Sequence, residues 1–151
     1  MSGVASRLEP SPRWSATSPS FIVAVVLATF MLFLGVRGLV APVAAAHGFG
    51  FAVADPRDAV WLRIKGDRDL TSALAMGLLL ALRWRRPLGA LLVASIASPL
   101  FDCLISLATP GHDTAYALAM HGGAAALVAG LGVVLLRRER AATVETAARQ
   151  R

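Results

Sequence analysis

Four uncharged and largely apolar stretches divide the chain, at residues 15–36, 70–82, 87–101 and 114–136. Long uncharged stretches of this kind are typical of helices that lie in a membrane. The second stretch is too short to span alone, because a helix over 70–82 would measure roughly 20 Å against a hydrocarbon core of ~30 Å. To span, this helix must include the charged run before it, Lys65-Gly66-Asp67-Arg68-Asp69.

The pattern predicts an all-α integral membrane protein, a four-helix bundle whose helices lie at about 20–41, 56–84, 88–108 and 114–136. Together these helices form one transmembrane domain over residues 20–138. The flanking segments, 1–19 and 139–151, are rich in polar and charged residues and are predicted to be disordered cytoplasmic tails.

A cleaved signal peptide is the competing interpretation of the first helix. Arg7 and Arg13, the apolar residues 21–34 and the small residues 44–46 follow one another as in a signal peptide. The uncharged stretch is longer than a signal peptide needs, however, and Arg37 lies between it and the supposed cleavage site. These features favour an uncleaved membrane-spanning helix.

Arginine clusters predict the orientation of the helices. The connection 83–87 contains three arginines, and the segment 137–140 contains three more. Short loops rich in Lys and Arg remain on the cytoplasmic side. Both ends of the chain are therefore expected inside (N-in/C-in), and the connections 41–55 and 109–114 outside. The protein is expected to be a multi-pass protein of the inner or plasma membrane of the cell.

The composition of the chain supports the prediction of a membrane protein and limits the classes of partner that it could bind. The chain has 151 residues, of which 56% are hydrophobic, and a formal net charge of +6. Because the excess charge lies in loops and tails, it indicates topology rather than nucleic-acid binding, and membrane lipid is the expected partner. The single cysteine, Cys103, excludes a disulfide within the chain and a paired-cysteine metal site. The sequence has no motif for a cofactor, so none is expected.

Smaller features refine the helices. Asp55 and Pro56 suit the N-cap and the first position of the second helix. Pro99 predicts a kink in the third helix. The connection 43–54 is unusually apolar, and two interpretations stay open, a lid over the bundle and an ordinary interfacial loop. Small residues four apart predict close packing of the third and fourth helices, at Ala90, Ala94, Ser98, Asp102 and Ser106, and at Gly122, Ala126 and Gly130.

Polar residues from all four helices are expected at a similar depth, in the outer half of the membrane. Six polar residues are expected in the outer half because of their positions along the helices: Arg37, Lys65, Arg68, Asp69, Asp102 and His121. Charged groups within a membrane are costly and usually mark a functional site. The alternative is structural, in that the charges only neutralise one another in ion pairs that fix the helix packing.

Each of these residues has an expected role if they form a site. His121 is the candidate acid/base group, because imidazole transfers protons near neutral pH, and Asp102 or Asp69 would orient it. Three cations would bind an anionic or carbonyl group of a lipophilic small molecule: Arg37, Lys65 and Arg68. The leading hypothesis is therefore an acid/base enzyme, an isomerase, cyclase or hydrolase.

Two other functions would use the same residues. A ligand-binding or transport component would hold the molecule without chemistry, and its four short helices would then require a homo-oligomer. An accessory membrane subunit is the third hypothesis. A metal site is not expected, because no spacing typical of metal ligands supports the set His121, His112, Asp102 and Asp113.

Several short motifs together resemble a known family of small membrane proteins. They are Arg37-Gly38, Phe49-Gly50, Lys65-Gly-x-Arg68-Asp69, Asp102 and His121-Gly122. The chain resembles domain-of-unknown-function family 4267 over about residues 20–136, and the run that begins at Lys65 is the most specific part. The resemblance implies four membrane helices and no established activity.

Overall fold

The structure, a computed structural model, describes residues 14–51, 53 and 55–149. The regular elements in these ranges are all helical, which confirms the all-α prediction. They are α1 (Pro19–Val40), α2 (Pro42–Gly48), η2 (Pro56–Ala59), α3 (Val60–Ala81), α4 (Arg85–Ser95), α5 (Ala97–Ala108), α6 (Thr114–Ala117), η3 (Leu118–Gly122) and α7 (Gly123–Arg149). Most of the predicted N-terminal tail, residues 1–13, lies outside the described residues.

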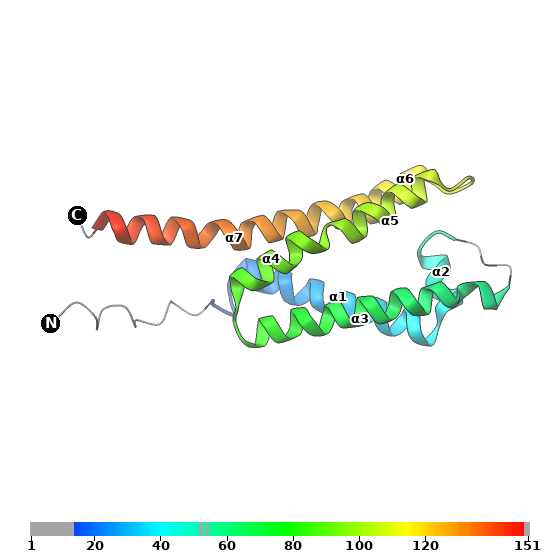
Figure 1. The fold of residues 1–151 in the computed structure, drawn as a ribbon, viewed down its shortest axis with the longest axis horizontal. Coiled ribbons are helices and arrows are strands. Elements are labelled where there is room, and N and C mark those ends of the chain that lie inside the picture. Colours follow the sequence, from blue (N-terminus) through cyan, green and yellow to red (C-terminus); the bar gives the residue numbers. More distant parts are fainter. Residues whose placement is uncertain (1–13, 52, 54, 150–151) are drawn as a thin grey trace.

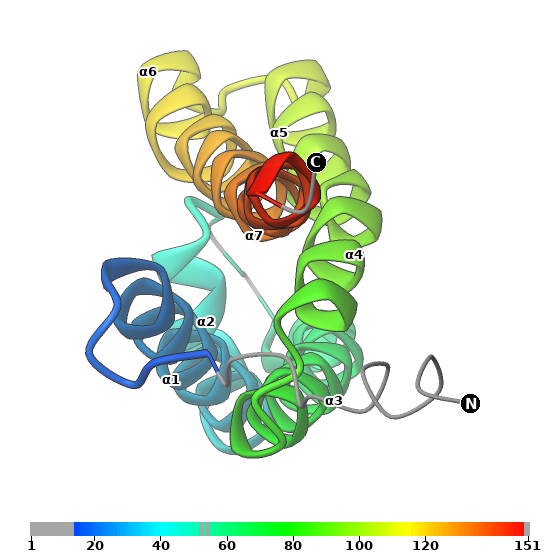
Figure 2. The ribbon, with the colours of Figure 1, turned by 90° about the vertical axis from the view of Figure 1, so that its left-hand side faces the viewer.

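The long helices form two antiparallel pairs (Figure 1). α1 packs along α3 in one pair, and α4 with α5 packs along α6, η3 and α7 in the other. Seen end-on, the pairs form two layers, with α2 on the side of α1 and α3 (Figure 2). The α3–α4 turn at residues 82–84 lies at one end of the molecule, here called the turn end. α2 and the α5–α6 connection at residues 109–113 lie at the opposite end, here called the loop end.

Glycines bring the backbones of α1 and α3 into contact. A Cβ atom on Gly66 would lie 2.8 Å from the carbonyl oxygen of Gly35, and one on Gly38 would lie 2.9 Å from the Cα atom of Gly66. Side chains at these positions would hold the helices apart, so small residues are required, as is common between membrane helices. The positions of these glycines in the sequence did not predict this packing face.

The close approach of α4 and α7 also depends on glycines that were not predicted. A Cβ atom on Gly89 would lie 3.2 Å from the carbonyl oxygen of Gly132. Gly130, one of the small residues that were predicted to pack closely, is exposed and has open space where a Cβ atom would lie. The predicted packing face of the fourth helix is therefore wrong, because α7 is rotated so that Gly132 faces α4.

Among the residues that the structure describes, three helical segments are long and apolar enough to cross a membrane: Pro19–Val40, Arg85–Ala108 and Thr114–Arg137. This finding is consistent with a membrane protein. α3 has 22 residues, as α1 does, but its first half contains five charged residues, between Arg63 and Asp69. It is not among the three apolar segments.

Two local predictions are confirmed. The Asp55 carboxylate accepts a hydrogen bond from the Arg57 backbone nitrogen at 2.8 Å and so caps η2, which leads into α3. The Arg57 side chain also donates to this carboxylate and lowers the pKa of Asp55. The third predicted helix is interrupted at Ile96, between α4 and α5, because Pro99 one turn later cannot donate to a carbonyl.

Two boundaries differ from the predicted ones. The connection 43–54 was expected to be a loop, but its first part belongs to α2, because Pro42 occupies the first turn and a run of alanines follows. The last helix continues to Arg149, into the segment that was expected to be a tail.

The apolar core lies near the turn end. Its buried residues come from α1, α3, α4 and α7: Ala24, Leu27, Ala28, Met76, Leu80, Leu88, Leu92, Val128, Leu131 and Leu135. Burial of these side chains holds the two layers together there. Toward the loop end the layers enclose a cavity instead, and the predicted polar residues lie in that half.

Candidate functional site

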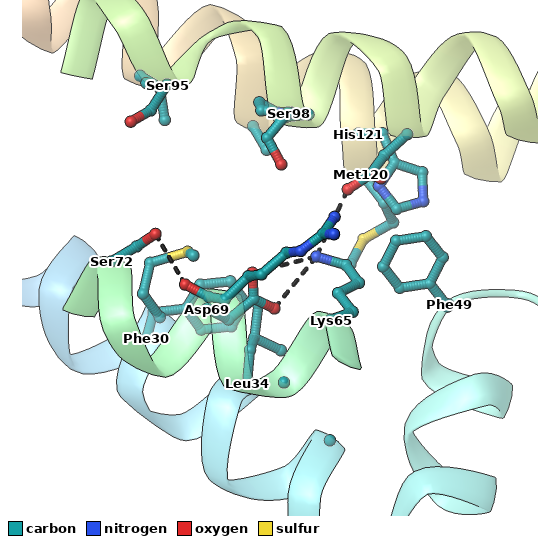
Figure 3. Close-up of a pocket in the computed structure, with 18 of the residues that line it drawn as sticks. Phe30, Leu34, Phe49, Lys65, Asp69, Ser72, Ser95, Ser98, Met120 and His121 are labelled. Carbon is teal, nitrogen blue, oxygen red and sulfur yellow. Dashed lines mark hydrogen bonds and ion pairs between the residues drawn. The ribbon is translucent and has the colours of Figure 1, made fainter. Parts of the chain in front are cut away.

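A cavity of about 450 Å³ lies between the two layers. Its wall includes residues of α1, α3, α4, α5, η3 and α7, together with the end of α2 (Figure 3). The volume is within the range of roughly 300–1,000 Å³ that is common for small-molecule sites. The wall is apolar toward the core, where Met31, Leu92 and Val128 line it, and polar toward the loop end.

The six residues predicted for the site all line this one cavity: Arg37, Lys65, Arg68, Asp69, Asp102 and His121. They come from α1, α3, α5 and η3, so the fold brings together residues that are far apart in the sequence. Their roles in binding or catalysis stay predictions. Their individual contacts differ, however, and these differences decide which roles are best supported.

Lys65 is the centre of a charged cluster. Its Nζ atom lies 3.1 Å from Oδ2 of Asp69, one turn further along α3, and 3.5 Å from Oδ2 of Asp102 on α5. Asp69 is only 7% exposed, and Lys65 is its ion-pair partner. The cluster contains one cation and two carboxylates, so by itself it has an excess of one negative charge.

The two arginines of the site have different surroundings. Arg37 Nη2 donates to the carbonyl oxygen of Ala44 at 2.7 Å, and its guanidinium group packs against Gly48, so it holds α2 against α1. Arg68 has an exposed side chain on the cavity wall. Within the described part of the chain, neither arginine is in an ion pair, and Arg68, unlike Arg37, has no side-chain hydrogen bond. Arg68 is therefore the better candidate to bind a ligand.

His121 is buried at the loop end of the cavity, with 8% of its surface exposed. The ring centroid of Phe49 lies 4.4 Å from that of the imidazole. Nε2 of His121 has no hydrogen-bond partner among the described residues. Among the described residues, His121 makes no hydrogen bond to Asp102 or Asp69, and both carboxylates pair with Lys65.

The backbone around His121 is also irregular. Residues 118–122 form a single π-helical turn, η3, between α6 and α7. Such turns insert one extra residue into a helix and are frequent at functional sites. This turn was not predicted, because nothing in the apolar sequence around His121 distinguishes a π turn from a regular helix.

Sequence reasoning missed Phe49, Phe30 and Met120 as cavity residues. The Phe49 ring lies over Lys65, with 5.2 Å from Nζ to its centroid, and packs edge-on against Trp61. The features of the sequence that could have identified Phe49 are the two glycines and two phenylalanines of the apolar connection 43–54. They indicated an unusual segment but not its contacts.

The four residues weighed as metal ligands have other contacts. Asp113 caps α6 by accepting from the backbone nitrogen of Ala115 at 2.8 Å, and His112 Nε2 lies 3.2 Å from the Phe49 carbonyl oxygen. In the ranges that the structure describes, no group of three His, Cys, Asp or Glu side chains could hold a metal ion. Cys103 is buried, and its thiol lies 3.6 Å from the carbonyl oxygen of Ala117, which is a packing role.

A family model described as Domain of unknown function (DUF4267) matches residues 28–135. The match covers most of the chain, including α1 from Ala28 onward and the whole cavity, and the protein belongs to this family. Comparison with curated proteins and with solved structures gives no match. The family description names no activity, so the function is argued from the cavity.

Proposed function

We propose that this DUF4267 protein is a four-helix integral membrane protein whose cavity binds a lipophilic small molecule with an anionic head group. The observation that carries this proposal is Arg68, a cation on the cavity wall whose side chain has neither an ion pair nor a hydrogen bond within the described residues. A cation within a membrane is costly unless a counter-charge or water solvates it. An anionic ligand would supply that counter-charge.

The proposed topology makes α3 the fourth spanning helix. It packs along α1, so it would cross the membrane with its neighbour and direct three of its charged residues, Lys65, Arg68 and Asp69, to the cavity. The arginine-rich turn and both ends of the chain would be cytoplasmic, and the loop end would face outward. The host membrane would be the inner or plasma membrane, with the transmembrane domain over residues 20–138 and a cytoplasmic tail on each side of it.

The charges of the cavity favour an anion over a cation. Three cations, Arg37, Lys65 and Arg68, face two carboxylates, Asp69 and Asp102, which leaves an excess of one positive charge with His121 neutral. The apolar part of the wall suits an alkyl or ring system. A molecule with a single carboxylate or phosphate at one end of a lipophilic body matches both parts.

This proposal can be tested with three single-chain amphiphiles of equal length. We expect dodecanoate to raise the Tm of the purified protein in a neutral detergent, because a ligand that binds only the folded state stabilises it. Dodecanol and dodecyltrimethylammonium have the same chain and should raise the Tm much less. Equal stabilisation by the cation would contradict the proposal.

Acid/base catalysis on the bound molecule is a second candidate function, by isomerisation, cyclisation or hydrolysis. The observation that favours it is the buried Nε2 atom of His121, which lies on the cavity wall without a hydrogen-bond partner among the described residues. An imidazole in this state could accept or donate a proton when a ligand is bound. The ion pairs of Asp102 and Asp69 with Lys65 weaken their proposed role in orienting this ring.

A further inference from the structure

Phe49 lines the loop end of the cavity, where its half-buried side chain lies beside Lys65 and His121 (Figure 3). Its ring contacts the imidazole of His121, with 4.4 Å between the centroids, and covers the ammonium group of Lys65. The distance of 5.2 Å from Nζ to the ring centroid is within the ~6 Å reach of a cation–π interaction. Phe49 and Lys65 belong to the α1–α3 layer, whereas His121 belongs to the opposite layer, so the ring bridges the two layers at this end (Figure 3).

The opposite layer also holds the backbone around Phe49. The Tyr116 hydroxyl donates a hydrogen bond to the carbonyl oxygen of Gly48, and His112 Nε2 donates to the carbonyl oxygen of Phe49 at 3.2 Å. Gly50 has a φ of +87°, and a Cβ atom there would lie 2.6 Å from His112 Nε2. Glycine is therefore needed at this position, and the Phe49 ring is held by contacts on both sides of it.

From these contacts we infer that Phe49 is the residue that separates the cavity from water at the loop end and limits which molecules reach Lys65 and His121 from that side. Tyr116 acts as its positioning residue, through the carbonyl of Gly48. Loss of the ring would open the polar part of the cavity to charged reagents in water. The inference concerns access to the cavity and does not depend on the ligand class of the proposed function.

Cysteine labelling tests this inference without a ligand. A cysteine is placed on the cavity wall by Ala124→Cys, at a half-buried position one turn after His121, in a Cys103→Ser background. The protein is reconstituted in nanodiscs of neutral lipid, so that water reaches both faces. The probe is a charged, membrane-impermeant methanethiosulfonate reagent, and the measured quantity is its rate of reaction with the new thiol. We expect slow labelling when Phe49 is intact.

Phe49→Ala should raise the labelling rate by about tenfold or more, which corresponds to about 1.4 kcal/mol in the free energy of opening. Tyr116→Phe removes one hydroxyl group and should raise the rate about threefold to tenfold, because one hydrogen bond that holds the Gly48 carbonyl is lost. Phe49→Trp keeps a ring in place and should label slowly. Phe101→Ala, on the exposed surface of α5, is the matched control and should not change the rate.

Two results would overturn the inference. The first is fast labelling of the protein with Phe49 intact, because the cavity would then be open to water past the ring. The second is slow labelling in both Phe49→Ala and Tyr116→Phe. If Phe49→Ala fails to fold, as judged by its elution from a sizing column, the conservative Tyr116→Phe decides the question alone.

Discussion

Lys65 of α3 and Asp102 of α5 form an ion pair with 3.5 Å between Nζ and Oδ2, and within the described residues it is the ion pair that connects the two helix layers. The Asp102 carboxylate lies on the cavity wall and is paired with Lys65, and no hydrogen bond joins it to His121 among the described residues. A carboxylate in this place should repel an anionic ligand and assist an acid/base reaction. Asp102 therefore distinguishes the two candidate functions.

Replacement of Asp102 by Asn should have opposite effects under the two candidates. In a binding protein, Asp102→Asn should strengthen the binding of dodecanoate by roughly tenfold, because a unit charge nearby is worth roughly 1–2 kcal/mol at the effective dielectric constant of a protein. In an acid/base enzyme that uses Asp102, it should abolish activity instead. Titration calorimetry measures the affinity. Asp67→Asn, on the exposed side of α3, is the matched control and should leave it unchanged.

The fold should survive Asp102→Asn, because Lys65 keeps its ion pair with Asp69. A large loss of folded protein in this variant, with Asp67→Asn folded normally, would instead favour the structural interpretation, in which the charges only fix the helix packing.

Replacement of His121 by Gln tests acid/base catalysis directly. Gln keeps a hydrogen-bonding side chain but cannot cycle a proton near neutral pH, so an enzyme should lose roughly 10²–10⁴-fold in rate while ligand affinity changes little. The measurement is turnover of a lipophilic substrate identified by screening, together with the affinity for dodecanoate. Full activity in His121→Gln would eliminate His121 as the acid/base group.

Replacement of Gly66 by Ala should separate α1 from α3. The added Cβ atom would lie 2.8 Å from the Gly35 carbonyl oxygen, and we expect a loss of about 1–3 kcal/mol in the free energy of unfolding. Gly77→Ala on the same helix has open space and should be neutral or stabilising by up to about 1 kcal/mol. Unfolding of both variants in mixed micelles gives the comparison. Similar stability of the two would contradict the packing described for α1 and α3.

Reporter fusions test the proposed topology. Fusions at Arg85 and at Arg151 should report a cytoplasmic position, because short connections rich in arginine remain inside. Fusions at Gly48 and Gly111, both at the loop end, should report the opposite side. A cytoplasmic Gly48 would contradict four spans and would show that α3 does not cross the membrane.

The sequence predicted which residues come together better than how they interact. The helical rise per residue was enough to predict that Lys65, Asp69 and His121 lie at a similar depth in the membrane, because position along a helix follows directly from residue number. Ion-pair partners depend on the rotation of neighbouring helices, which the sequence does not specify. The rotation of α7 shows the same limit, since Gly132 rather than Gly130 faces α4.

The loop end shows a second limit of sequence reasoning. The contacts of Phe49 with His121 and of Gly48 with Tyr116 join segments that are far apart in the chain. No local pattern encodes such pairs. The apolar and glycine-rich character of the connection was visible, but its position over Lys65 depends on how α2 packs against α1 and α3.

The most direct test of the account compares two arginines of α3 in an equilibrium binding measurement with dodecanoate. Arg68 lines the cavity, whereas Arg63 is exposed and lies outside it. Arg68→Gln should weaken binding by roughly tenfold to a hundredfold, because a hydrogen bond to a charged group contributes about 1.5–3 kcal/mol, and Arg63→Gln should leave the affinity unchanged. Equal affinity in the two variants, with both folded, would contradict the claim that the cavity binds an anionic head group through Arg68.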